Sequence, residues 1–207
     1  MTTTTSRSES RSGVRGADKF EARRSELANA TLVTLAELGY ARTSLREIAQ
    51  NSPYSHGVLH YYFRDKLDLI AEAVKIFEAM CVTRYDEAVA TSTTAGELRH
   101  GFTDMFFTTL ASESSLHRLW YDLRNQTRFE SALRAEVADI ETRRAQMIWN
   151  VIDRYCELRG EPSRMSESLA YVTFDGIFQR GLDDLLNGVD VKALESRRLL
   201  DEAFDAL

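Results

Sequence analysis

Apolar residues recur three and four positions apart along most of this chain, and this spacing constrains the fold more than any other feature. Only two prolines, Pro53 and Pro162, interrupt the pattern, and no segment shows the apolar–polar alternation of a half-buried strand. We therefore predict an all-α fold, with helices near residues 18–38, 44–51, 55–62, 66–90, 96–111, 115–125, 130–159, 164–187 and 190–205.

The first third of the chain contains clear signals for helix ends. Gly39 stands where a helix ends on a residue with positive φ, and Ser44 with Glu47 has the spacing of a capping box. Pro53 excludes the residue before it from the α region, and Ser55 is a favourable N-cap. These signals predict two short helices separated by a turn of about three residues.

A helix–turn–helix of this kind places its second helix in the major groove of DNA. Leu59 and Phe63, four residues apart, are expected to face a small core with Leu45 and Ile48. The remaining side chains of the second helix are polar or aromatic, so they suit base edges, thymine methyl groups and phosphates. This outward set is Ser55, His56, Val58, His60, Tyr61 and Tyr62.

The distribution of charge supports this interpretation, although the net charge is −6. Residues 1–66 contain ten Lys and Arg against seven Asp and Glu, whereas the rest contains 16 against 25. Attraction to phosphates is screened within about 10 Å, so the local excess of positive charge matters more than the total.

The stretch from Leu27 to Ile70 resembles the DNA-binding domain of TetR-family repressors. The resemblance rests on an ordered set with the family spacing: Gly39-Tyr40, Thr43-Ser44-Leu45, Ile48-Ala49, Ser55, Gly57, Leu59, Tyr62-Phe63, Asp65-Lys66 and Leu69. Further along, Leu119 to Leu123 and Asp175-Gly176-Ile177 resemble BetI-like regulatory domains. The resemblance implies a ligand-responsive repressor with phosphate contacts from Thr43, Tyr62 and Lys66. With Ser44 and Arg46, these complete the predicted DNA-binding residues.

Two positions depart from the family pattern. Pro53 replaces the usual glycine of the turn and is followed by Tyr54, and His60 replaces a common tyrosine. Because proline cannot take positive φ, we expect Asn51 or Ser52 to do so instead. An alternative is a binding module that has kept the fold and lost DNA binding, and Pro53 is the feature that favours it.

The resemblance also predicts the division of the chain and its partners. We expect a disordered polar tail at residues 1–17, a helix–turn–helix domain at 18–64, and a helical ligand-sensing and dimerisation domain at 65–207. The expected partners are an operator in double-stranded DNA, a small-molecule effector and a second copy of the chain. The resemblance implies that the two helix–turn–helix domains of a dimer, about 34–36 Å apart, read a near-palindromic operator.

The sensing domain is rich in aromatic residues, and some of them are expected to line a pocket for an apolar or aromatic effector. The predicted ligand-binding residues are Phe77, Tyr85, Phe102, Phe106, Trp120, Tyr121, Arg124, Trp149, Phe174 and Phe178. The last two helices are expected to form a four-helix bundle with the partner, through Leu169, Val172, Thr173, Gly176, Ile177, Leu185, Leu194 and Leu199.

Other classes of protein fit the sequence less well. His56 and His60 have a spacing that can present two imidazoles to a metal, but further ligands and any HExxH motif are missing. We expect no metal, no cofactor and no enzymatic activity. Cys81 and Cys156 lie far apart inside helical patterns, which favours free, buried thiols. No apolar run approaches the roughly 18 residues of a membrane span, so we expect a cytoplasmic protein without a membrane partner.

Overall fold

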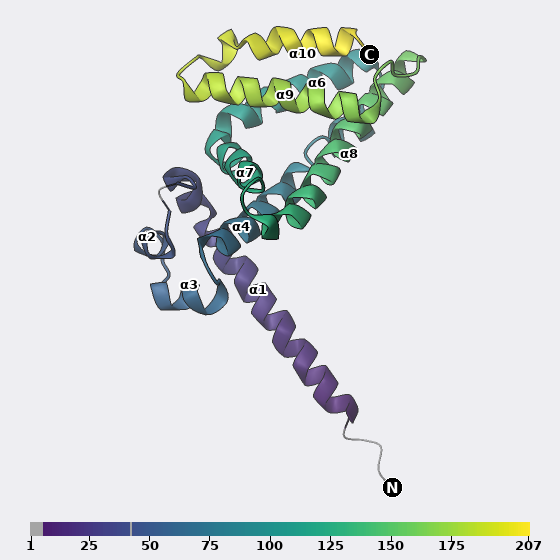
Figure 1. Ribbon diagram of the computed structural model, residues 1–207. Helices are drawn as coiled ribbons and strands as arrows, with labels where there is room; N and C mark the ends of the chain where they lie inside the picture. Colours follow the sequence, from purple (N-terminus) through teal and green to yellow (C-terminus); the bar gives the residue numbers. More distant parts are fainter. Residues whose placement is uncertain (1–5, 42) are drawn as a thin grey trace. The chain divides into compact units, whose positions relative to one another are not determined.

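The structure is a computed structural model that describes residues 6–41 and 43–207, with side chains from residue 18 onward. Over these residues every regular element is a helix (Figure 1), which confirms the all-α prediction. The α-helices are α1 Ser6–Leu38, α2 Leu45–Gln50, α3 His56–Tyr62, α4 Lys66–Cys81, α5 Asp86–Thr91, α6 Ala95–Ser112, α7 Ser114–Gln126, α8 Arg134–Arg159, α9 Glu167–Leu186 and α10 Glu195–Asp205. Short 3₁₀ helices, η1 Ser131–Leu133 and η2 Val191–Ala193, precede α8 and α10.

The chain forms two compact units, residues 1–77 and 78–207, and the boundary falls inside α4. The first contains the helix–turn–helix, and the second contains α5 to α10 together with the last residues of α4.

Helix α1 is longer than the sequence pattern predicts. It begins at Ser6, not near Asp18, so residues 6–17 are helical where we expected a disordered tail, and residues 1–5 lie outside the described residues. This segment contains no proline, and extending an existing helix adds one hydrogen bond for each residue fixed. The absence of an apolar stripe was therefore a poor guide to where α1 starts.

The first unit has the predicted helix ends. Gly39 has φ 74°, as expected for a residue that closes a helix, and its amide donates to the Leu35 carbonyl at 2.9 Å. The Ser55 hydroxyl accepts from the Val58 amide and caps α3. The Ser44 hydroxyl accepts from the Glu47 amide in the same way at the start of α2. Helices α1, α2 and α3 pack against one another around the fully buried side chains of Leu27, Leu35, Ile48, Leu59 and Phe63.

The turn between α2 and α3 closes without the unusual backbone that we predicted. Asn51 has φ −107°, and among the described residues only glycines have positive φ. Side chains hold the turn instead: the Asn51 amide group donates to the Glu47 carbonyl at 2.9 Å, and the Thr34 hydroxyl donates to the Asn51 carbonyl at 2.9 Å. These contacts allow Pro53 to occupy the turn without strain at its neighbours.

Helix α4 ends at Cys81, whereas the pattern predicted one helix to about Ala90. The amide of Arg84 donates to the Cys81 carbonyl in a turn, and a new helix, α5, begins at Asp86. The turn brings Tyr85 into the core, where its ring centroid lies 4.4 Å from that of Phe102. Tertiary packing of one aromatic residue thus overrides a pattern that was compatible with a continuous helix.

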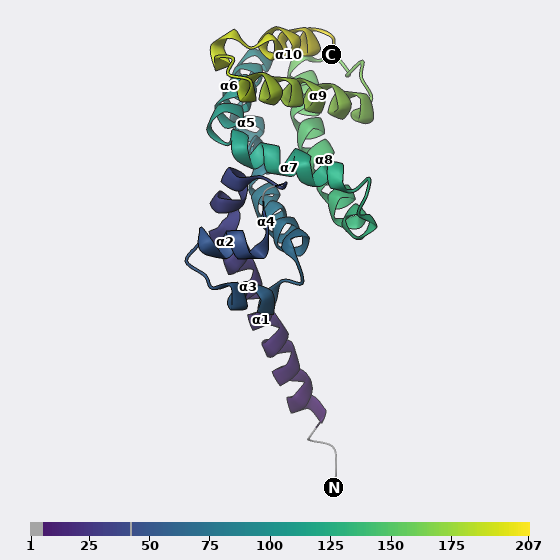
Figure 2. The ribbon, with the colours of Figure 1, turned by 60° about the vertical axis from the view of Figure 1, so that its left-hand side comes forward.

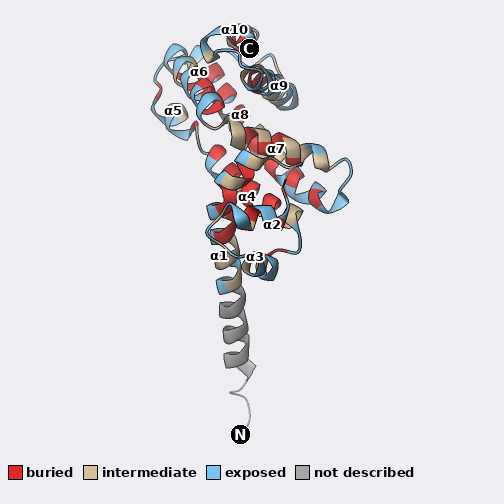
Figure 3. Cartoon of the chain, turned by 90° about the vertical axis from the view of Figure 1, so that its left-hand side faces the viewer, coloured by how far each residue is buried: buried red, intermediate tan, exposed pale blue. Residues whose placement is uncertain are grey.

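The second unit is built around α9, which packs against α6, α7, α8 and α10. Helices α9 and α10 lie side by side in Figures 1 and 2. Buried residues follow the inner sides of α6 and α7, shown in red in Figure 3. An aromatic cluster fills this core: the ring of Phe102 lies within 6 Å of Tyr85, Phe106, Phe174 and Phe204, at centroid distances of 4.4, 5.7, 5.8 and 5.6 Å.

Gly181 allows α9 to approach its neighbours closely within the protomer. A Cβ atom at this position would lie 2.7 Å from the Ser196 hydroxyl oxygen and 2.8 Å from a methyl carbon of Leu110. A Cβ at Gly176 would meet no atom within 4 Å, and this glycine is exposed.

Cys81 and Cys156 are free and buried, as predicted. No helix over residues 6–41 and 43–207 combines the length and the apolar character that crossing a membrane requires.

Candidate nucleic-acid interface and cavity

Helix α3 presents most of its predicted contact residues to solvent. His56, His60 and Tyr61 are exposed, with Tyr61 exposing 72% of its surface, while Val58 and Tyr62 are half-buried. Ser55 is exposed as well, and its hydroxyl can still donate to a phosphate while it accepts from the α3 backbone. Leu59 is the residue of α3 that is buried in the core, so the face with His56, His60 and Tyr61 is left for a partner.

The exposed rings of α3 are held in contact with one another. The imidazoles of His56 and His60 lie 4.3 Å apart and nearly perpendicular, and the rings of Tyr61 and Tyr62 lie 4.9 Å apart. Phe20 of α1 packs against both tyrosines, with centroid distances of 6.1 and 4.9 Å. In the part of the chain with described side chains, no group of three or more His, Cys, Asp or Glu residues is arranged to hold a metal.

Arg24 of α1 fixes the segment between α3 and α4. Its guanidinium donates to the Tyr62 carbonyl at 3.0 Å and to the Asp68 carboxylate at 2.5 Å, and it lies 4.8 Å from the centre of the Phe63 ring. Burial raises the pKa of Asp68, but hydrogen bonds from Arg24 and from the amide of Arg64 outweigh it, so the net pKa is lowered. Asp68 therefore stays ionised at neutral pH and keeps the end of α3 against α1.

Several predicted phosphate contacts are engaged within the unit. Thr43 is buried, and its hydroxyl donates to the Gly39 carbonyl. Lys66 donates to the Tyr40 carbonyl at 3.1 Å and lies 4.3 Å from the centre of the Tyr40 ring. Lys66 keeps further donors for a phosphate, whereas the Thr43 side chain does not face solvent. Ser44 and Arg46 are exposed, so both remain candidates for backbone contacts.

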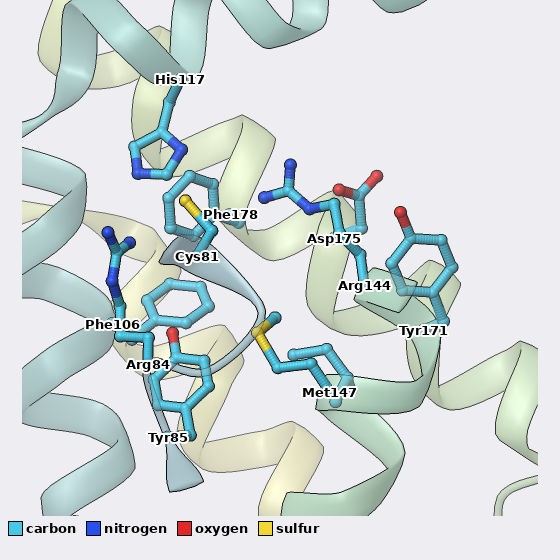
Figure 4. A pocket seen from close by; sticks show the side chains of 11 residues that line it. Cys81, Arg84, Tyr85, Phe106, His117, Arg144, Met147, Tyr171, Asp175 and Phe178 are labelled. Carbon is cyan, nitrogen blue, oxygen red and sulfur yellow. The ribbon is translucent and has the colours of Figure 1, made fainter. Parts of the chain in front are cut away.

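The second unit encloses a small cavity between the α4–α5 turn and helices α6, α7, α8 and α9 (Figure 4), with a volume of about 30 Å³. Of the ten predicted ligand-binding residues, Tyr85, Phe106 and Phe178 line it. The others do not: Phe77 belongs to the first unit, Trp149 lines a separate open groove with Cys156 and Pro162, Arg124 lies outside the cavity wall, and the rest, Phe102, Trp120, Tyr121 and Phe174, are core residues.

A buried ion pair lies beside this cavity, and sequence reasoning missed it. Arg144 of α8 donates to the carboxylate of Glu78 of α4 at 3.3 Å, and both residues are buried. No residue in the described part of the chain forms a hydrogen bond with the second carboxylate oxygen of Glu78, Oε2. A signal was present in the sequence, because Arg144 stands between Ile140 and Ile148 on the apolar stripe of α8.

His117 is the second buried polar group on the wall of the cavity, and it too was not predicted. Its imidazole is 1% exposed and packs 4.6 Å from the ring of Phe178. Burial, and then the positive charges of Arg144 and Arg84, lower the pKa of His117 well below its usual value. His117 is therefore neutral at physiological pH.

Asp175, which also lines the cavity, accepts hydrogen bonds from two neighbouring side chains. One of its carboxylate oxygens accepts from the Tyr121 hydroxyl at 2.9 Å, and the other accepts from Arg124 at 2.7 Å. Arg124 also forms an ion pair with Glu141 at 2.8 Å, and the Tyr171 hydroxyl donates to the carboxylate of Glu141. Arg124, one of the predicted ligand-binding residues, thus connects Asp175 with Glu141.

The residues predicted for the dimer interface fall into three groups by their exposure. On α9, Leu169 is 53% exposed and Val172 is 67% exposed, and Gly176 lies on the same outer face. Thr173, Leu185 and Leu199 are half-buried. Ile177 and Leu194 are already buried within the protomer, so they have no surface left for a partner. The exposed residue Leu186, which was not predicted, extends the outer face of α9.

Comparisons with known proteins agree with this arrangement. Residues 27–73 match the family model described as bacterial regulatory proteins, tetR family. The chain is 26% identical over 190 residues to the HTH-type transcriptional regulator BetI of Paraburkholderia phymatum, with 90% of this chain and 93% of that protein covered. It is 27% identical over 165 residues to BetI of Burkholderia thailandensis, with coverages of 78% and 82%.

The fold is similar to that of the transcriptional regulator FadR of Bacillus subtilis, solved in complex with stearoyl-CoA, with a TM-score of 0.65. This similarity covers 87% of this chain and 97% of FadR at 19% identity. The family match covers the helix–turn–helix, and the relatives are transcriptional regulators rather than enzymes. Residues 27–73 therefore belong to the tetR family of bacterial regulatory proteins, and the chain resembles DNA-binding transcriptional regulators of that family along most of its length.

Proposed function

We propose that this regulator is a repressor that binds a near-palindromic operator as a homodimer and leaves it when a small molecule occupies the cavity of the second unit. The observation that carries the proposal is the exposed imidazole and phenol surface of α3, whose ends are fixed by Ser55 and Arg24. A helix held in this way can offer the same side chains to every operator it meets. FadR, which shares the fold, was solved with stearoyl-CoA, and this favours a small-molecule effector here.

Helix α4 provides a physical route from the cavity to the DNA-binding unit. It begins at Lys66 in the first unit, and its last residues, 78–81, belong to the second unit, where Cys81 lines the cavity. A ligand that prefers a cavity shape with α4 displaced shifts the population toward that state. In the dimer, two helix–turn–helix domains displaced in this way no longer match successive major grooves. The affinity for the operator then falls by the ratio of the ligand's affinities for the two states.

Removal of the Tyr61 ring tests the role of α3. Because Tyr61 is 72% exposed, Tyr61→Ala should leave the fold intact. We expect the dissociation constant for the operator to rise about 5- to 100-fold, since a contact at a base pair is worth roughly 1–3 kcal/mol. Fluorescence anisotropy with an operator obtained by selection measures the change. Phe129→Ala, at an aromatic residue of the second unit that is 81% exposed, is the matched control and should bind like the unaltered protein.

A charge on the outer face of α9 tests the proposed dimer. Val172→Arg places a guanidinium on a residue that is 67% exposed, so it should not disturb the protomer. If α9 packs against its partner copy, an unpaired charge buried there costs several kcal/mol, and light scattering after size exclusion should show a monomer. Met105→Arg, at a residue of α6 that is 40% exposed, should remain a dimer. A dimeric Val172→Arg variant would place the interface elsewhere.

A further inference from the structure

The wall of the cavity combines an apolar body with two guanidinium groups. Cys81, Met147 and Ile148 contribute sulfur and aliphatic surface, and Phe106 and Phe178 contribute rings. Arg84 and Arg144 reach the same wall from the α4–α5 turn and from α8, and Figure 4 shows them with His117 around the rings. Such a wall suits a molecule with an apolar body and one polar group.

The charged groups at the wall differ in how many hydrogen-bonding positions remain free for a ligand. Both oxygens of the Asp175 carboxylate accept hydrogen bonds from Tyr121 and Arg124. In contrast, the bond from Arg144 to Glu78 uses one of the five donors of a guanidinium. Arg84 likewise donates through one nitrogen to Glu113, at 2.5 Å. The cavity therefore offers donors with positive charge more readily than acceptors.

The ion pair of Arg144 is long and incomplete. Its 3.3 Å separation exceeds the roughly 2.7–2.9 Å of a strong charge-assisted bond, and none of the described side chains or amides bonds to Oε2 of Glu78. The neutral state of His117, caused by burial and by the nearby Arg144 and Arg84, is consistent with positive potential in the same space. A second carboxylate beside Arg144 would use donors that Glu78 leaves vacant.

We propose that the cavity binds monocarboxylates with an apolar or aromatic body, and that Arg144 and Arg84 hold the ligand carboxylate. This assignment rests on the proposed effector role of the cavity and names its ligand class. A ligand ammonium would stand beside two guanidinium groups and is disfavoured by their charge. The space of about 30 Å³ holds one or two water molecules. A ligand must therefore displace a wall residue such as Met147, whose unbranched chain adapts readily.

Isothermal titration of the full-length protein with three probes of nearly equal shape tests the assignment. These probes are benzoate, benzamide and benzylammonium, all at neutral pH. We expect benzoate to bind at least 10-fold more tightly than benzamide, with benzylammonium the weakest. Arg84→Gln should weaken benzoate binding about 10-fold. Arg198→Gln, at an exposed arginine of α10 that pairs with Glu195 and Glu202 away from the cavity wall, is the matched control and should retain the preference.

A double variant distinguishes loss of ligand recognition from loss of the fold. Replacing the pair together, as Glu78→Leu with Arg144→Met, removes both buried charges and should preserve the fold. It should lose most of the preference for benzoate over benzamide and keep only the part that Arg84 supplies. Benzamide or benzylammonium binding as tightly as benzoate to the unaltered protein, or no binding of any probe, would overturn the ligand class.

The titrations, read together with operator affinity in the presence of each probe, distinguish a wrong ligand class from a wrong effector role. If benzoate binds with the expected preference and leaves operator affinity unchanged, the ligand class stands and the effector role fails. If benzamide binds better and releases the operator, the effector role stands and the ligand class is wrong.

Discussion

Replacing Glu78 by Leu while Arg144 remains is expected to lower the free energy of unfolding of the second unit by about 3–5 kcal/mol. The substitution leaves a guanidinium in the core, where Arg144 is 6% exposed and lies 5.2 Å from the Trp120 ring. An arginine does not lose its proton in a protein, so the charge must stay buried or force the core open. Urea denaturation measures the loss.

The double variant Glu78→Leu with Arg144→Met is the control for this prediction. Because both charges leave together, its free energy of unfolding should lie within about 1.5 kcal/mol of the unaltered protein. Arg144→Met alone should cost less than Glu78→Leu alone, since burial already raises the pKa of Glu78 and its carboxyl can take up a proton. Additive losses in the double variant would show that the two groups do not interact.

Phe102→Ala is expected to have an effect of similar size in the same unit. Phe102 has no exposed surface, and its ring contacts Tyr85, Phe106, Phe174 and Phe204 from three other segments of the unit. Truncation removes the transfer free energy of the ring and leaves a cavity among rings that can relax only partly. Together these terms cost about 3–5 kcal/mol.

Tryptophan fluorescence reports on the second unit alone, because both tryptophans, Trp120 and Trp149, lie in it. Phe129→Ala removes an equal ring that is 81% exposed, and it should change the free energy of unfolding by less than about 0.5 kcal/mol. A loss below about 1 kcal/mol for Phe102→Ala would contradict the packing described for this core.

Local chemistry made the helix–turn–helix predictable from sequence. Gly39 and Ser55 mark helix ends through their own backbone and hydroxyl, and no distant residue is needed for that. The turn at Pro53 was harder, because Thr34 of α1 supplies a hydrogen bond that sequence neighbours do not reveal. The end of α4 was missed for the same reason, since the packing of Tyr85 against Phe102 decides it.

The cavity was predictable only in part. Helical spacing identifies Tyr85, Phe106 and Phe178 as buried, but it assigns the same burial to Phe102 and Phe174, which pack the core instead. The position of a residue on a helix predicts that its side chain is buried, but it does not predict whether that side chain borders a cavity or packs in the core. The surface of α9 shows the same limit, because Ile177 and Val172 both look like interface residues in sequence, and neighbouring helices bury only Ile177.

Binding-site selection from a random DNA library, followed by footprinting of the enriched sequence, tests the central claim most directly. We expect a near-palindrome with two protected half-sites whose centres lie about 34–36 Å, or 10–10.5 base pairs, apart, or a multiple of that distance. The Tyr61→Ala variant should protect the same sequence only at higher concentration. A folded, unaltered protein that enriches no sequence above the starting library would contradict the assignment of α3 as the helix that reads DNA.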